Sequence, residues 1–273
     1  MRVALCCAVL GCAVLLGLTP AGATPMSTYY VTAGNQARMF VLQGAALSSW
    51  ATLEYHEDPI SVSGGYVRTW LASDPGIGGG AEYTLSGTPT GTTYPGGAPS
   101  FSRDGTTDGA HNYVVGFDDG VVYRTGLDWS SPQALFGLPT DYDRWFGITY
   151  DAADNTLWTS MWFADTIAHW SLTGTLLGAL STGVNGMTSL ALDPADRTLW
   201  FGTQGDLSEA TRTFYQFSRD GSLMDTAQYS GLTNYDCMGG EFAVTARAIP
   251  EPTTLGLMGM GLVGLALRRR RRG

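Results

Sequence analysis

The sequence predicts an all-β domain built from a repeated four-stranded unit, and three observations predict it. First, Gly147–Trp158 (GITYDAADNTLW) and Ser189–Trp200 (SLALDPADRTLW) align without a gap at a spacing of 42 residues. Second, each copy has an apolar strand, an Asp-rich turn and a strand that opens Thr-Leu-Trp. Third, the segments around them divide into short runs separated by Gly, Asn and Asp, as in hairpin turns. A period of about 40–45 residues with several strands per unit is typical of a β-propeller blade.

Two units follow the repeat closely and two follow it loosely. The close units are expected to have strands at Phe146–Asp151, Thr156–Trp162, Ile167–Leu172 and Thr175–Leu180, and at Met187–Asp193, Thr198–Thr203, Thr213–Ser218 and Ser222–Tyr229. The loose units are expected at Ile60–Ser63, Tyr66–Ala72, Ala81–Ser86 and Thr90–Tyr94, and at Ser100–Asp104, His111–Phe117, Val121–Leu127 and Gln133–Leu138.

A fifth blade is predicted to combine the two ends of the domain. Met238–Val244 aligns with the inner strand of a blade but has no strands after it. The opening segment supplies three strands, at Tyr29–Ala33, Arg38–Gln43 and Leu47–Thr52, and no inner strand. Joining them closes the ring and removes the open sheet edges that an exported β protein must protect. The expected fold is therefore a small propeller of about five four-stranded antiparallel blades.

The N-terminus carries the three parts of a secretory signal peptide. Arg2 precedes the apolar run Val3–Leu18, and small residues at Ala21 and Ala23 predict cleavage after Ala23. Such a peptide implies export through the Sec translocon. A membrane-spanning helix and a lipoprotein site at Cys12 are the alternatives, although the run is short and Cys12 lies early in it.

The C-terminus carries a second ordered set of signals. Pro250, Glu251 and Pro252 precede the apolar run Leu255–Leu267, which five arginines follow (Arg268, Arg269, Arg270, Arg271 and Arg272). As a helix, Thr253–Leu267 would be about 22 Å long, short for a hydrocarbon core of about 30 Å. The arginines can extend to lipid headgroups and hold this tail at the cytoplasmic face.

This C-terminal set resembles the PEP-CTERM sorting signal. The resemblance implies processing by an exosortase, a membrane-embedded transpeptidase-like enzyme of Gram-negative, exopolysaccharide-producing bacteria. A plain C-terminal membrane anchor is the alternative. The expected organisation is a signal peptide at residues 1–23, a propeller domain at 24–249 and a sorting segment at 250–273.

The mature chain is also similar to a family of uncharacterised exported propeller proteins with PEP-CTERM tails. The matching segments are Asp104–Gly109, Leu127–Ser130, Ser189–Asp193 and Gly239–Phe242. The resemblance implies architecture and export and brings no activity with it.

The charge and cysteine content of the mature domain exclude several kinds of partner and stabilisation. Without Arg2, Arg268–Arg272 and Glu251, nine basic and 23 acidic residues remain, a net charge of −14, and the chain contains no Lys. Such a surface repels nucleic acid and anionic lipid. Cys237 is the one cysteine beyond the signal peptide, so the domain forms no internal disulfide. We expect Cys237 to act as a small buried hydrophobe.

No catalytic constellation is visible, and no cofactor is expected. His56, His111 and His169 lack the spacing of a metal site. The pairs Asp104/Asp108, Asp151/Asp154 and Asp193/Asp196 are expected to recur at one blade position. They are read as caps of tight turns, with Ca²⁺ binding as the alternative. Trp158 and Trp200 are read as packing between blades, with a glycan-stacking rim as the alternative.

Glu241 is the candidate site residue. In the blade alignment it occupies the position of Ile148 and Leu190, which should face the space between blades. A carboxylate there loses hydration unless it is paired or hydrogen-bonded. We therefore expect Glu241 to be buried and partnered by Arg38, Arg68 or backbone amides, either locking the closing blade or contacting a ligand at the channel.

Two classes of function remain open. One is a non-enzymatic protein of the cell surface or exopolysaccharide matrix that binds glycan or protein and is membrane-attached through its tail before processing. The other is a secreted propeller enzyme, a polysaccharide lyase or hydrolase. Titratable side chains converging at one mouth of the channel would favour the enzyme, and small or apolar groups would favour the binding protein.

Overall fold

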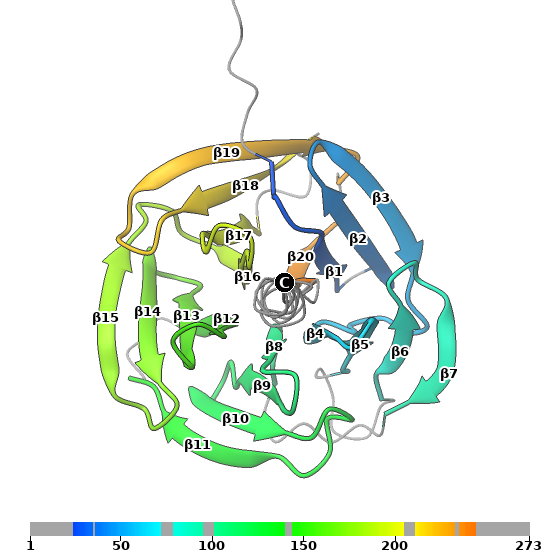
Figure 1. Ribbon diagram of the computed structural model, residues 1–273, viewed down its shortest axis with the longest axis horizontal. Coiled ribbons are helices and arrows are strands. Elements are labelled where there is room, and N and C mark those ends of the chain that lie inside the picture. Colours follow the sequence, from blue (N-terminus) through cyan, green and yellow to red (C-terminus); the bar gives the residue numbers. More distant parts are fainter. Residues whose placement is uncertain are drawn as a thin grey trace, which may run out of the picture.

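The chain forms a ring of five four-stranded antiparallel sheets (Figure 1). The computed structural model describes residues 24–34, 36–71, 79–94, 101–139, 144–204, 211–232 and 235–243. In these ranges every element of regular structure is a strand. Within them there is also no helix long and apolar enough to cross a bilayer.

Each blade runs from an inner strand at the axis to an outer strand at the rim. Two blades consist of β4 (Ile60–Ser63), β5 (Tyr66–Thr69), β6 (Ala81–Thr84) and β7 (Pro89–Thr93), and of β8 (Gly105–Thr107), β9 (Asn112–Val115), β10 (Val121–Thr125) and β11 (Gln133–Gly137). Two more consist of β12 (Trp145–Asp151), β13 (Thr156–Met161), β14 (Thr166–Ser171) and β15 (Leu176–Ser181), and of β16 (Met187–Leu192), β17 (Leu199–Thr203), β18 (Thr211–Phe217) and β19 (Leu223–Ser230).

The fifth blade is shared between the two ends of the domain, which confirms the predicted closure. Its order is β20 (Cys237–Phe242), β1 (Tyr29–Ala33), β2 (Arg38–Gln43) and β3 (Ala46–Ala51). In the antiparallel pairing of β1 with β20, Tyr29 lies opposite Phe242 and Tyr30 lies opposite Glu241. Aromatic rings pack at this seam: Tyr29 stacks on Phe242 with ring centroids 4.5 Å apart.

One predicted strand is wrong. The inner strand of the second blade is β8, Gly105–Thr107, and the expected Ser100–Asp104 precedes it instead. The Asp104 side chain accepts hydrogen bonds from the backbone amides of Gly105, Ile148 and Gly240, so a side chain replaces part of the ladder there. The short polar sequence Gly-Thr-Thr has none of the apolar alternation that marks a strand.

The blades pack face to face through apolar clusters. Trp158 lies with Ile167 and Leu190 between two neighbouring blades, and Trp200 lies with Tyr29 and Phe214 in the next interface. Both indoles are almost fully buried, which confirms their predicted role in the core.

The axis of the ring is filled by the inner strands, and β20 fits there because it carries two glycines. A Cβ on Gly239 would overlap the carbonyl oxygen of Asp58, and one on Gly240 would lie 2.7 Å from that of Ser189. The amide of Gly239 donates to Thr32 Oγ1 at 2.8 Å. These two glycines therefore allow the backbone of β20 to approach its neighbours closely at the axis.

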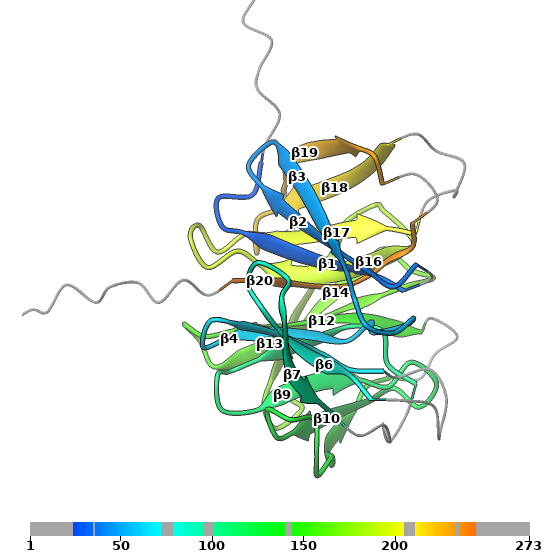
Figure 2. The ribbon, with the colours of Figure 1, turned by 90° about the vertical axis from the view of Figure 1, so that its right-hand side faces the viewer.

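The terminal signals lie outside the described residues. These are the signal peptide at 1–23 with Ala21 and Ala23, and the segment at 250–273 with its expected apolar helix. The last described residue, Ala243, is buried and its amide donates to Thr28 O. Thr28 and Ala243 are thus neighbours, next to the seam where β1 and β20 run side by side (Figure 2).

Candidate functional site

A pocket of about 510 Å³ opens on the ring axis where the five inner strands end. Each blade contributes to its lining, from the end of its inner strand or from the turn that follows. The lining includes Gly64, Thr107, Tyr150, Ala153, Leu192 and Glu241. This volume lies in the range of small-molecule sites in proteins.

Glu241 is the buried acid of this pocket. Glu241 is 6% exposed and lies in β20, the inner strand of the shared blade. The Thr106 hydroxyl donates to Glu241 Oε2, and the Phe242 amide donates to Oε1 at 3.0 Å. Burial raises the pKa of Glu241 to about 8, against the smaller opposing effect of these hydrogen bonds. The side chain is therefore largely protonated at neutral pH.

The expected burial of Glu241 is present, but neither arginine suggested as its partner reaches it. Arg38 donates to Ser49 Oγ, and Arg68 pairs with Glu82 at 3.0 Å. Both arginines lie farther out in their blades, in β2 and β5. The other expected partner, a backbone amide, is present at Phe242, and the Thr106 hydroxyl is the second donor.

Thr106 connects Glu241 to the neighbouring blade. The Tyr150 amide donates to Thr106 Oγ1 at 3.0 Å, so the Thr106 hydroxyl hydrogen is available to the carboxyl. Thr149 makes the equivalent contact one blade further on, where its Oγ1 accepts from the Leu192 amide at 3.0 Å. Thr106 was not predicted as a site residue, and its match with Thr149, 43 residues later and in the same alignment as Asp108 with Asp151, is the signal that would have found it.

A second buried acid lies beneath Glu241. Asp104 is fully buried and accepts from the amides of Gly105 and Gly240 at 2.8 Å and of Ile148 at 3.2 Å. Burial raises the pKa of Asp104 well above its usual range, and the nearby Glu241 adds to the rise. Because its two carboxyl oxygens accept hydrogen bonds from amides of three blades, Asp104 links these blades at the axis.

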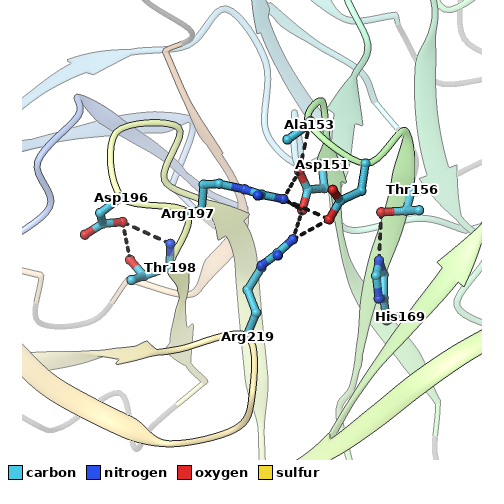
Figure 3. Close-up of polar contacts among 9 residues, drawn as sticks. Asp151, Ala153, Thr156, His169, Asp196, Arg197, Thr198 and Arg219 are labelled. Carbon is cyan, nitrogen blue, oxygen red and sulfur yellow. Dashed lines mark hydrogen bonds and ion pairs between the residues drawn. The ribbon is translucent and has the colours of Figure 1, made fainter.

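One wall of the pocket carries a cluster of two acids and two arginines (Figure 3). Arg197 Nη2 lies 3.0 Å from Asp151 Oδ2 and 2.8 Å from Asp154 Oδ2. Arg219 Nη1 reaches the same two oxygens at 2.5 and 2.6 Å. The Asp151 side chain is 1% exposed, so its charge needs these partners. The four charges balance within the cluster.

The acidic turns occupy a different register from the predicted one. Asp108 matches Asp151 and Asp193, whereas Asp104 lies four residues earlier, before its inner strand. Asp108 accepts from the amides of Ala110 and His111 at 2.7 and 2.6 Å, and Asp193 accepts from the Met26 amide at 2.9 Å. Asp196 likewise caps its turn through the Thr198 amide. These carboxylates cap turns or, in the case of Asp193, bind the backbone at Met26.

The remaining sequence-named residues are dispersed. His169 stacks on Trp158 with ring centroids 4.0 Å apart, and burial with the nearby Arg219 lowers its pKa. His111 contacts Asp108, and His56 lies 3.9 Å from Asp58. Cys237 is buried, and burial raises its thiol pKa to about 12. In the described part of the chain, no three His, Cys, Asp or Glu side chains are grouped as metal ligands would be.

The opposite mouth of the ring is aromatic. Phe117, Phe146 and Met238 form a small buried cluster against which Phe101 and Trp162 pack. The guanidinium of Arg103 lies 4.1 Å from the Phe101 ring centroid, and that of Arg144 lies 4.6 Å from that of Phe117. These contacts cover the end of the axis away from the pocket.

Comparison with known proteins adds a sorting motif and a fold. Residues 248–271 match the PEP-CTERM protein-sorting motif. No curated protein matches the sequence. A chain of a nidogen/laminin complex is similar in structure, with a TM-score of 0.53 at 13% identity over 80% of this chain and 98% of that one.

One further solved structure supports this likeness, and another matches more weakly. A functionally unknown protein from Desulfotomaculum acetoxidans DSM 771 has a TM-score of 0.51 at 11% identity over 82% of this chain and 87% of that one. A streptogramin B lyase has a TM-score of 0.44 at 15% identity, covering 76% and 70% of the two chains. At such identities the likeness concerns the fold alone. The chain is thus an exported protein that has a five-bladed propeller and a C-terminal PEP-CTERM sorting motif.

Proposed function

We propose that this protein is an exported binding module whose ligand enters the axial pocket. The observation that carries the proposal is the buried carboxyl of Glu241 in a pocket to which all five blades contribute. Burying such a group without a cation costs stability. A ligand that contacts it would compensate this cost, which a purely structural role leaves unexplained.

The sorting motif supports a place for this module in the cell envelope. An exosortase-type enzyme would process the tail, which anchors the protein in the membrane of a Gram-negative bacterium until then. The propeller would afterwards be displayed at the cell surface or released into exopolysaccharide. The pocket is the size of a small molecule, so a glycan or protein partner would insert a single group into it.

A variant that blocks the pocket tests the binding role. Ala152 is an exposed turn residue in the lining, so Ala152→Trp should fill the mouth and leave the core intact. Ala179→Trp, on an exposed outer strand of the same blade, is the matched control. Small metabolites and oligosaccharides would be screened by ligand-observed NMR against all three proteins. Ligands lost only with Ala152→Trp support the proposal, and a screen in which no ligand depends on Ala152 contradicts it.

An enzyme is the second candidate, because a carboxyl with a pKa of about 8 can accept and donate a proton near neutral pH. The pocket combines acidic side chains with an apolar lining, so both of the features that were expected to separate the two classes occur together. Incubation with polysaccharides and with the ligands from the screen distinguishes them. An enzyme releases products, and Glu241→Gln stops their release, whereas a binding module returns its ligand unchanged.

A further inference from the structure

We propose that the axial pocket takes an organic ammonium group carried on an apolar body. This inference rests on the proposed binding function and names the class of ligand.

The charges of the pocket do not balance. Arg197 lines the pocket, but its guanidinium is engaged with Asp151 and Asp154, and Arg219 completes that cluster. Asp108 and Glu241, which also line the pocket, form no ion pair with an arginine in the described part of the chain. Asp108, which His111 and Tyr113 contact through hydrogen bonds, therefore supplies negative charge to the cavity, and Glu241 adds a second charge once a cation stabilises its ionised form.

The apolar lining of the pocket favours an organic cation over a metal ion. Tyr150, Ala152, Ala153, Leu192 and Pro194 supply apolar surface around the acids. A small hydrated metal ion would leave this surface uncovered, and no three acidic or histidine side chains are grouped to ligate one in the described ranges. An alkylammonium ion covers the walls with its body and places its head near the carboxyl. Tyr150, which stacks on Tyr113, also lines the pocket, and aromatic rings attract ammonium groups.

Cation binding should displace a proton from Glu241. The titratable groups near it come from every neighbouring inner strand except β4, which contributes none. They are Asp104 and Asp108 from the β8 segment, Tyr150 and Asp151 from β12, Arg197 from the turn after β16, and Tyr29 and Tyr30 from β1. Burial keeps Glu241 protonated at neutral pH, since its pKa is about 8. An ammonium head pairs best with the ionised form, so binding should tighten as the pH rises toward 8 and release a proton.

Calorimetry with three probes of one length tests the charge requirement. Hexylammonium, 1-hexanol and hexanoate would be titrated into the whole propeller between pH 6 and 8.5, where an alkylammonium ion stays charged. We expect hexylammonium to bind at least about tenfold more tightly than either other probe. Its affinity should rise by up to about tenfold per pH unit below pH 8. Titrations in buffers of different ionisation enthalpy should report the released proton.

Two variants and a matched control locate the site. Glu241→Gln should weaken hexylammonium by about tenfold or more, and should abolish the pH dependence. Asp108→Asn, in the turn after β8, should cause a smaller loss. Glu57→Gln removes another buried carboxyl, one that accepts from Thr69 and Tyr83 outside the pocket, and should leave binding unchanged. Thermal melts of each variant identify any that is not folded.

The results separate the ligand class from the binding function. Three results would overturn the ammonium assignment. Hexanol or hexanoate could bind as tightly as hexylammonium, or the affinity for hexylammonium could be unchanged in both Glu241→Gln and Asp108→Asn. The third is that CaCl₂ displaces hexylammonium while the organic probes do not compete with one another. If the library screen finds neutral or anionic ligands that Ala152→Trp abolishes, the binding function stands and only the ligand class is wrong. If no ligand depends on Ala152, both are wrong.

Discussion

Replacing Glu241 by Gln should change how the stability of the propeller depends on pH. The pKa of Glu241 is about 8 in the folded protein, against an ordinary value of 4.5. The folded state therefore holds a proton that the unfolded chain releases between these two values. The stabilisation from this proton is complete below about pH 4.5 and is lost as the pH rises to about 8.

The size of the effect follows from the pKa difference. Each unit corresponds to about 1.4 kcal/mol, so full ionisation of Glu241 costs up to about 5 kcal/mol, of which about 3 kcal/mol is already lost at pH 7. Glutamine has a similar shape and does not ionise. Between pH 5 and 8 the unfolding free energy of the variant should therefore fall less steeply than that of the native sequence. The difference between the two slopes should be about 1.4 kcal/mol per pH unit.

Urea unfolding at several pH values measures this slope. Glu54→Gln, which removes an acid from an exposed turn, is the control and should leave the slope unchanged. If Glu241→Gln lowers stability equally at every pH with the same slope as the native sequence, Glu241 is ionised in the fold. The reasoning from its burial would then be wrong.

Three further outcomes are expected. Deleting Thr24–Thr52 removes β1, β2 and β3 and exposes the edge of β20, so soluble folding should be lost; a deletion protein that melts like the intact domain would refute the shared blade. Intact-mass spectrometry of the protein exported by its native host should show a chain without Arg268–Arg272, and a full-length C-terminus would leave the plain-anchor interpretation. Arg219→Gln should destabilise the fold by about 1–3 kcal/mol, because Asp151 is buried. Arg144→Gln, in an exposed ion pair, should change stability by less than about 1 kcal/mol.

The sequence predicts the architecture well because blades repeat. The match between Gly147–Trp158 and Ser189–Trp200 fixes the register of two blades, and Met238–Val244 can then be identified as a lone inner strand. The error at Ser100–Asp104 has a local cause. There, backbone amides donate hydrogen bonds to the Asp104 side chain in place of strand pairing, and a pattern of apolar residues does not predict such bonds.

The pocket was less predictable than the ring. The same register placed Glu241 between blades and so anticipated its burial. Its partner could not be chosen, because Arg38 and Arg68 were selected for charge alone and their positions in β2 and β5 decide their reach. The Arg197–Arg219 cluster joins two turns of one blade to a turn of the next, and no spacing in the sequence signals it.

The shared blade also sets the order in which the ring can form. A chain made from its N-terminus presents β1 early, but the partner strand β20 follows about 200 residues later. Until then β1, with its buried Tyr29 and Tyr30, can pair with β2 on one side only. Its other edge, which faces β20 in the finished ring, has no partner strand. Because such edges invite pairing with other chains, the unfinished propeller is open to aggregation until β20 is in place. β20 ends six residues before the sorting motif begins at residue 248, so the last contact of the fold becomes available just as the signal for sorting does.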